Sequence, residues 1–128
     1  MDRIDIWVTV GAVDYDKLST IEQSGEKTMT IKERVEKARN IQTKRFKGGA
    51  RKINTNSEMN VKDLAIYAPL TDEIKQLLNQ SAERLQLSAR AYHRVIKLAR
   101  TIADLEGSET ITQAHILEAL QYRPRTST

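Results

Sequence analysis

Cysteine is absent from this chain of 128 residues, and so is any long apolar run. Without cysteine the chain can form neither a disulfide framework nor a metal site with thiolate ligands, which fits a reducing compartment. No apolar stretch approaches the roughly 20 residues that span a bilayer. The opening residues 1–4 (MDRI) lack the apolar segment of a signal peptide. We therefore expect a cytoplasmic domain with no membrane partner.

The composition is that of a folded, soluble protein. Apolar residues make up 39% of the chain and charged residues 30%, a balance typical of a helix-rich globular domain and not of a disordered segment. A chain of this length suits one domain and can bury a core without covalent cross-links.

Positive charge is concentrated in one part of the chain, which we call the basic block (residues 37–57). It contains no acid and seven basic residues: Lys37, Arg39, Lys44, Arg45, Lys47, Arg51 and Lys52. Because these seven charges exceed the formal total of +4, the rest of the chain carries −3. Such a localised block indicates a polyanion partner, and all its members except Arg39 are our candidate DNA contacts. The alternative is a solvated helix end followed by a flexible linker.

The pattern of apolar residues predicts a mainly α fold, a small helical bundle preceded by one strand. Apolar residues alternate over residues 3–10, as in a strand, but no second strand is predicted to pair with it. We therefore expect residues 1–29 to be the remnant of a larger α/β core, a strand followed by a loop. Residues 30–122 form the helical domain, with a basic linker at 47–58, and residues 123–128 form a disordered tail.

Helix-capping residues set the boundaries of the predicted helices. Thr30 begins a helix that ends at about Phe46, and Asn60 begins a short one ended by Pro69. Further helices begin at Thr71, after Ser88 and after Thr112, and Gly107 ends the second of these three. The first predicted helix carries one apolar stripe, formed by Ile31, Val35, Ala38 and Phe46.

The chain shows no catalytic motif of its own. The string from Gly25 to Thr28 (GEKT) lacks the glycine spacing of a phosphate-binding P-loop, and no Walker B segment is recognisable. The two histidines, His93 and His115, lie on different predicted helices without a nearby carboxylate at ligand spacing. Structural histidines with hydrogen-bond partners are therefore a better interpretation than a zinc site. We expect no enzymatic activity from this chain alone.

Arg90 is the candidate binding residue, because it lies in the first turn after Ser88. A cation at the positive end of a helix is mildly unfavourable unless an anion binds there too. Free backbone N–H groups and a guanidinium would then hold the anion together. Arg94 and Lys97 continue the same face. The alternative is a surface arginine that reaches an acid such as Glu83.

The longest motif resembles the C-terminal domain of magnesium-chelatase-like AAA+ ATPases, in the ComM/YifB branch. The motif is residues 87–107 (LSARAYHRVIKLARTIADLEG), and residues 116–123 (ILEALQYR) resemble the ending of that branch. The opening residues 2–5 (DRID) are similar to the end of a conserved segment of its ATPase core. Residues 33–35 (ERV), with Ala38, Arg39 and Gln42, also fit.

This resemblance implies that the chain is the helical lid of a longer ATPase. Arg90 matches the sensor-2 arginine, which reaches the γ-phosphate of ATP. Arg3 matches the arginine finger that completes the site of a neighbouring subunit. ATP and Mg²⁺ would be bound in the full-length parent, and by no site of this fragment alone. The partners implied are the AAA+ core of the same polypeptide, the other subunits of a homo-oligomeric, hexameric ring, and DNA, which the parent would process.

Two other functions remain open at the level of sequence. One is an autonomous basic helical module that binds nucleic acid through the basic block. The other is an adaptor that contacts other proteins through an exposed apolar patch.

Overall fold

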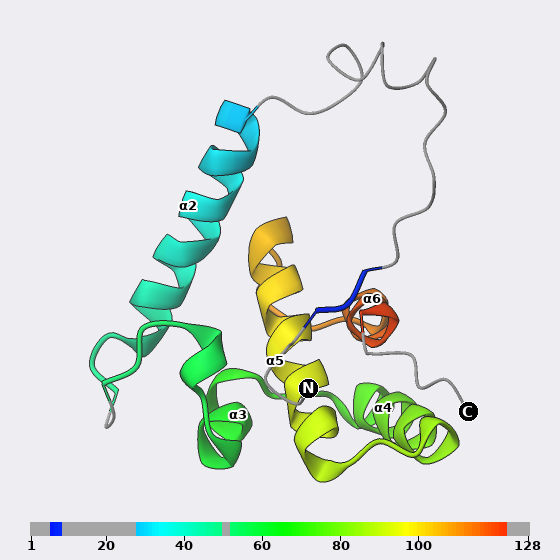
Figure 1. The fold of residues 1–128 in the computed structure, drawn as a ribbon. Coiled ribbons are helices and arrows are strands. Elements are labelled where there is room, and N and C mark those ends of the chain that lie inside the picture. The colour runs from blue at the N-terminus through cyan, green and yellow to red at the C-terminus, as the bar shows by residue number, and fades with distance from the viewer. Residues whose placement is uncertain (1–5, 9–27, 50–51, 123–128) are drawn as a thin grey trace, which may run out of the picture.

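A computed structural model describes residues 6–8, 28–49 and 52–122, and the regular structure within these ranges is helical (Figure 1). The elements are α2 (Thr28–Phe46), the short 3-10 helix η1 (Asn56–Glu58), α3 (Val61–Tyr67), α4 (Asp72–Leu85), α5 (Ala89–Glu106) and α6 (Gln113–Gln121). The prediction of a mainly helical bundle is confirmed. The first helix begins two residues earlier than predicted, at Thr28.

The predicted strand is not seen in the part of it that is described. Residues 6–8 form no strand, although the backbone N–H of Trp7 donates to the carbonyl of Tyr122 at 2.7 Å. The other residues of the predicted strand, Arg3 among them, lie outside the described residues. So do Arg51 and the tail at 123–128.

Local capping explains why these helices begin and end where they do. The Ser88 hydroxyl accepts from the backbone N–H of Ala91 at 3.1 Å, and Asn60 and Asp63 form a reciprocal capping box at the start of α3. Gly107 ends α5 in the left-handed conformation, with φ of 82°. These three predictions from sequence are confirmed.

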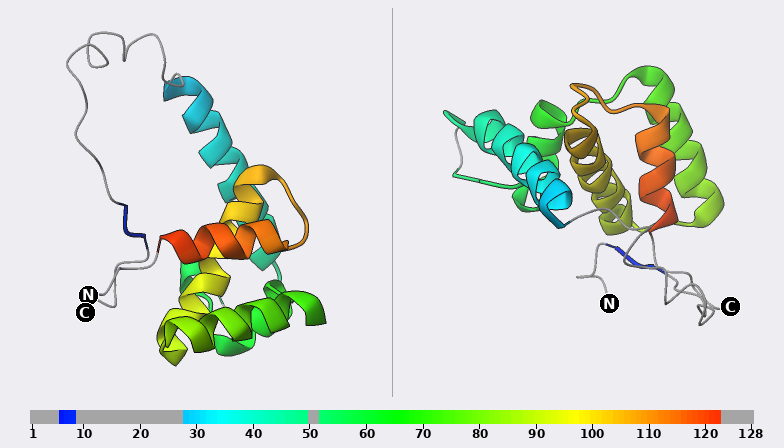
Figure 2. Two further views of the ribbon diagram at one scale, coloured as in Figure 1. Left: turned by 90° about the vertical axis from the view of Figure 1, so that its right-hand side faces the viewer. Right: turned by 90° about the horizontal axis from the view of Figure 1, so that it is seen from above.

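Helix α5 is the centre of the bundle (Figure 2). It packs against α6 and α2, and its buried Ala99 shares the core with Leu78 of α4 and Ile116 of α6, all without exposed surface. At the lower end of α2 in Figure 1, the ring of Phe46 meets the edge of Tyr67 in α3, with centroids 4.9 Å apart. Helix α5 is thus surrounded by the other helices over much of its length.

Part of the segment predicted as a basic linker (residues 47–58) packs into the core. Ile53 and Asn56 are buried, as is Met59 immediately after the segment. Residues 52–59 therefore pack against α5 through η1 instead of forming a flexible linker.

None of the described helices has both the length and the apolar character that a membrane crossing would require.

Candidate functional site

Arg90 lies exposed in the first turn of α5. This turn contains no acidic residue, whereas the first turn of α4 contains Asp72 and Glu73. The positive end of the α5 dipole is therefore not balanced by a carboxylate of its own first turn. Glu83, the alternative partner considered for Arg90, is exposed near the end of α4.

A short connection with hydrogen bonds on both sides joins the end of α4 to the start of α5. Gln86 ends α4 in the left-handed conformation, and the N–H of Leu87 donates back to the carbonyl of Ala82 at 2.9 Å. One turn into α5, the hydroxyl of Tyr92 donates to the side-chain oxygen of Asn79 at 2.7 Å. Because this connection is short and hydrogen-bonded on both sides, we expect Arg90 to move together with the helical bundle and not independently of it.

The other two basic residues proposed for this face lie farther along α5. Arg94 and Lys97 are half-buried, and the ammonium of Lys97 donates to the carbonyl of Ser57 in η1 at 3.4 Å. Lys97 thus contacts the segment between α2 and α3.

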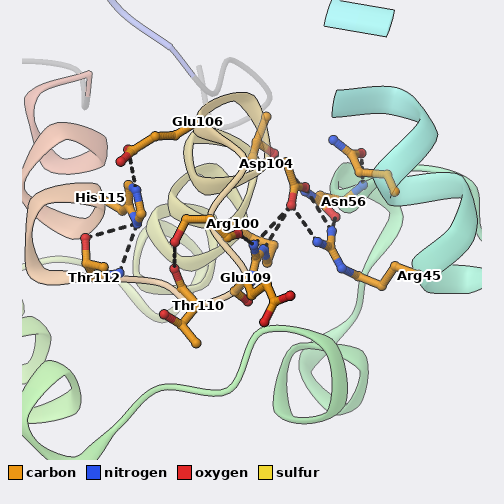
Figure 3. A network of polar contacts seen from close by, with 12 residues as sticks. Arg45, Asn56, Arg100, Asp104, Glu106, Glu109, Thr110, Thr112 and His115 are labelled. Atoms are coloured by element: carbon orange, nitrogen blue, oxygen red, sulfur yellow. Dashed lines mark hydrogen bonds and ion pairs between the residues drawn. The ribbon is translucent and has the colours of Figure 1, made fainter. Parts of the chain in front are cut away.

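A buried polar network lies at the other end of α5, around Asp104 (Figure 3). Arg45 of α2 binds both oxygens of this carboxylate, with its Nη1 at 2.9 Å from Oδ2. The side-chain amide of Asn56 donates to the same Oδ2 at 2.8 Å, and Nε of Arg100 donates to Oδ1 at 3.2 Å. One carboxylate therefore joins α2, η1 and α5.

Arg100 connects this network to the loop before α6. Its two terminal nitrogens donate to the carbonyls of Glu109 and Ser108, at 2.9 and 2.7 Å. Burial lowers the pKa of Arg100, while the adjacent Asp104 carboxylate opposes that shift. Hydrogen bonds to the carboxylate and to the two carbonyls offset the cost of burying the charge of Arg100, whose side chain is only 3% exposed.

The segment at Asn56 is bonded on both sides. Its backbone N–H donates to the side-chain oxygen of the buried Gln42 at 3.0 Å, and its amide also donates to the hydroxyl of Thr101 at 3.1 Å. Sequence reasoning did not single out Asn56, Arg100 or Asp104. The four-residue spacing of Arg100 and Asp104 on one helix was the available signal, whereas nothing local marks Asn56.

The basic block divides into residues with two different surroundings. The side chain of Arg45 is only 14% exposed and is bound to Asp104, so it has a structural role. Four other candidates are exposed: Lys37, Lys44, Lys47 and Lys52. Lys37 and Lys44 are seven residues apart and share the outer face of α2, away from Ala38 and Gln42.

His115 has the structural role, with hydrogen-bond partners, that was predicted from the sequence. Its Nδ1 accepts from the backbone N–H of Thr112 at 2.9 Å, and its Nε2 lies 2.7 Å from a carboxylate oxygen of Glu106 (Figure 3). Because Nδ1 accepts, the ring proton lies on Nε2 and is donated to Glu106. His93 contacts the ring of Tyr92 edge-on. In the described ranges no three side chains of His, Asp or Glu gather as metal ligands.

The sequence of this chain is similar to those of several known proteins. The family model for the C-terminal domain of magnesium chelatase subunit ChlI matches residues 25–123. Competence protein ComM of Haemophilus influenzae is 38% identical over 123 residues, which are 96% of this chain and 23% of ComM. The uncharacterized protein YifB of Escherichia coli is 33% identical and that of Salmonella typhimurium 32%, with the same coverage. The chain therefore spans about a quarter of the length of these relatives.

Proposed function

This chain belongs to the family of the magnesium chelatase subunit ChlI C-terminal domain, and we propose that it acts as the helical lid of an AAA+ ATPase of the ComM and YifB type. In this proposal the ATP, its Mg²⁺ and the hydrolytic machinery belong to a core that precedes the lid in a longer polypeptide. The lid contributes Arg90 to that site. The parent assembles as a hexameric ring that processes DNA.

The observation that carries the proposal is the position of Arg90, exposed on a helix start that has no carboxylate in its first turn. A phosphate at this end would meet a guanidinium, backbone N–H groups of the first turn and the positive end of the helix dipole. A planar guanidinium also suits the equatorial oxygens of a phosphoryl group in transfer. Arg90 would therefore bind more tightly as negative charge develops there.

A second arginine belongs to the same proposal. Arg3, outside the described residues, would act as the arginine finger of the neighbouring subunit's site. Its assignment rests on the similarity of residues 2–5 (DRID) to the ATPase core of the family.

Replacing the matching segment of Haemophilus influenzae ComM with this chain gives a full-length protein in which to test Arg90. We expect Arg90→Ala to lower the rate of ATP hydrolysis at least about tenfold, because a charge-stabilising donor acts mainly on the transition state. Arg90→Lys should recover only part of the rate, since an ammonium cannot match two oxygens as a guanidinium does.

Lys75→Ala provides the matched control, because Lys75 is an exposed cation on the neighbouring helix α4. It should leave the rate unchanged. In the isolated chain, Arg90→Ala and Lys75→Ala should each change the free energy of unfolding by no more than about 0.5 kcal/mol, as is usual for exposed positions. Normal ATP turnover by Arg90→Ala in the full-length protein would refute the sensor role.

A second candidate function, DNA binding by the isolated chain, is favoured by the outer face of α2. Lys37 and Lys44 are exposed there on one side of the helix, and Lys47 follows at its end. Contacts of lysines with phosphates would be independent of sequence and sensitive to salt. Binding of duplex DNA to this chain, titrated against salt, tests this function.

A further inference from the structure

Helix α2 carries one apolar seam that is only half covered. Ile31, Val35, Ala38 and Gln42 follow one another at spacings of four, three and four residues, so they lie on one side of the helix. Ala38 and Gln42 are buried against the bundle, whereas Ile31 and Val35 are 46% and 39% exposed. Both Figure 1 and Figure 2 show the reason, because α2 runs past the end of α5.

Basic residues border the uncovered half of the seam on both edges. Lys32 and Arg39 lie toward one edge of the seam and Arg34 toward the other, as their spacing from Ile31 and Val35 requires. The acids of this stretch, Glu33 and Glu36, lie on the far side of the helix, as does Lys37. The seam therefore presents an apolar strip with a basic border.

We infer that the seam at Ile31 and Val35 is the docking surface for the domain that precedes this chain in the longer polypeptide. The occupant would offer an apolar patch bordered by carboxylates. This inference rests on the proposed function in one respect, namely that such a preceding domain exists.

Two observations identify that domain as the occupant. The uncovered half is the N-terminal half of α2, the end at which the preceding polypeptide arrives, and the chain matches only 23% of the length of its relatives. The seam is also continuous with the packing of α2 on α5, so one helix face would be shared by the two neighbours. Since Arg45 binds Asp104 on α5, a domain docked on α2 would set the position of α5 relative to itself.

Amide hydrogen exchange of residues 28–37 tests the inference in the isolated chain and in the full-length chimaera with Haemophilus influenzae ComM. We expect these amides to exchange at least about tenfold more slowly in the chimaera, because docking protects a helix end that otherwise opens locally. Val35→Asp should remove this protection in the chimaera. In the isolated chain it should leave the thermal unfolding midpoint nearly unchanged.

Met29→Asp is the matched control. Met29 is 73% exposed in the first turn of α2, on the side opposite the seam. It should keep the protection that Val35→Asp removes. Equal exchange in the isolated chain and the chimaera would overturn the inference. So would protection in the isolated chain that rises with its concentration, since the occupant would then be a second copy.

The outcome is separable from that of the proposed sensor role. Arg90→Ala in the chimaera should lower ATP hydrolysis and leave the protection of residues 28–37 intact. If the protection appears but Arg90→Ala hydrolyses ATP normally, the docking surface stands and the sensor role fails. If Arg90→Ala abolishes turnover without any protection of α2, the reverse holds.

Discussion

At the scale of single residues, Asp104 is the centre of the buried polar network, because its carboxylate accepts hydrogen bonds from Arg45, Asn56 and Arg100. It is flanked by Arg45 and Arg100, whose side chains are 14% and 3% exposed. Removing the carboxylate would leave two cations with little access to water. Breaking a buried ion pair in this way costs about 3–5 kcal/mol, which is a large part of the stability of a small domain.

We therefore expect Asp104→Ala to lower the free energy of unfolding by about 3–5 kcal/mol, measured by urea denaturation followed by circular dichroism. Arg45→Met should cost less, because Arg100 then still neutralises Asp104. Lys44→Met is the control for Arg45, since Lys44 is its exposed neighbour on α2. A loss of less than about 1 kcal/mol in Asp104→Ala would show that the network is replaceable.

Whether a residue could be predicted from the sequence depends on how far away its partners are. Ser88 and Asn60 were predicted as caps because each bonds to a backbone group three residues away. The pairing of Arg45 with Asp104 spans 59 residues, so sequence reasoning placed Arg45 among the DNA contacts. Only the packing of α2 on α5 shows that its guanidinium is already bound.

At the scale of secondary-structure elements, the ends of α4 and α5 use the same left-handed conformation with different residues. Gln86 ends α4 with φ of 54°, and Gly107 ends α5 with φ of 82°. A side chain in this conformation costs about 1 kcal/mol that glycine avoids. Gln86 adopts it because Leu87, which follows, packs against the core and bonds to Ala82.

We expect Gln86→Gly to raise the free energy of unfolding by about 0.5 kcal/mol, since the gain at the helix end is partly offset by a more flexible unfolded chain. Gly107→Ala should lower it by about 1 kcal/mol. Nothing lies within 4 Å of a Cβ built on Gly107, so backbone strain alone decides that cost. Thermal denaturation of both variants checks the pair, and shifts of the same sign would contradict it.

Apart from the start of α2, where the cap predicted at Thr30 is wrong, the helices were predictable because their caps and apolar periodicity agree. The apolar stripe predicted through Ile31 and Ala38 exists, but only its second half is buried. Periodicity identifies which side of a helix is apolar and does not tell how far the neighbouring helix extends. The segment around Ile53 and Asn56 shows the converse, since its polar, basic composition concealed residues that are buried.

At the scale of the whole molecule, charge is distributed unevenly along the chain. The basic block carries seven positive charges, while the rest of the chain carries −3. Of the described members, Arg45 is held by Asp104, so its charge is partly neutralised within the fold. Among the described residues, the exposed lysines of α2 and of the segment after it, together with the exposed Arg39, are therefore the part of the block that an external polyanion can reach.

This division leads to a prediction for duplex DNA. We expect the logarithm of the binding constant of the isolated chain to fall linearly with the logarithm of the salt concentration, with a slope of about −0.9 per phosphate contacted. The double variant Lys37→Gln, Lys44→Gln should lose two phosphate contacts and so make that slope less steep by about 1.8. Fluorescence anisotropy of a labelled duplex at several salt concentrations measures it.

Two controls separate contact with DNA from net charge. Lys62→Gln with Lys75→Gln removes the same two charges from exposed positions on α3 and α4, outside the basic block. If only long-range attraction matters, both double variants should weaken binding equally. If α2 forms the contact, only the first should change the slope. Arg45→Met should also leave the slope unchanged, because that guanidinium is bound to Asp104 before any DNA arrives. No binding at low salt would exclude this function for the isolated chain.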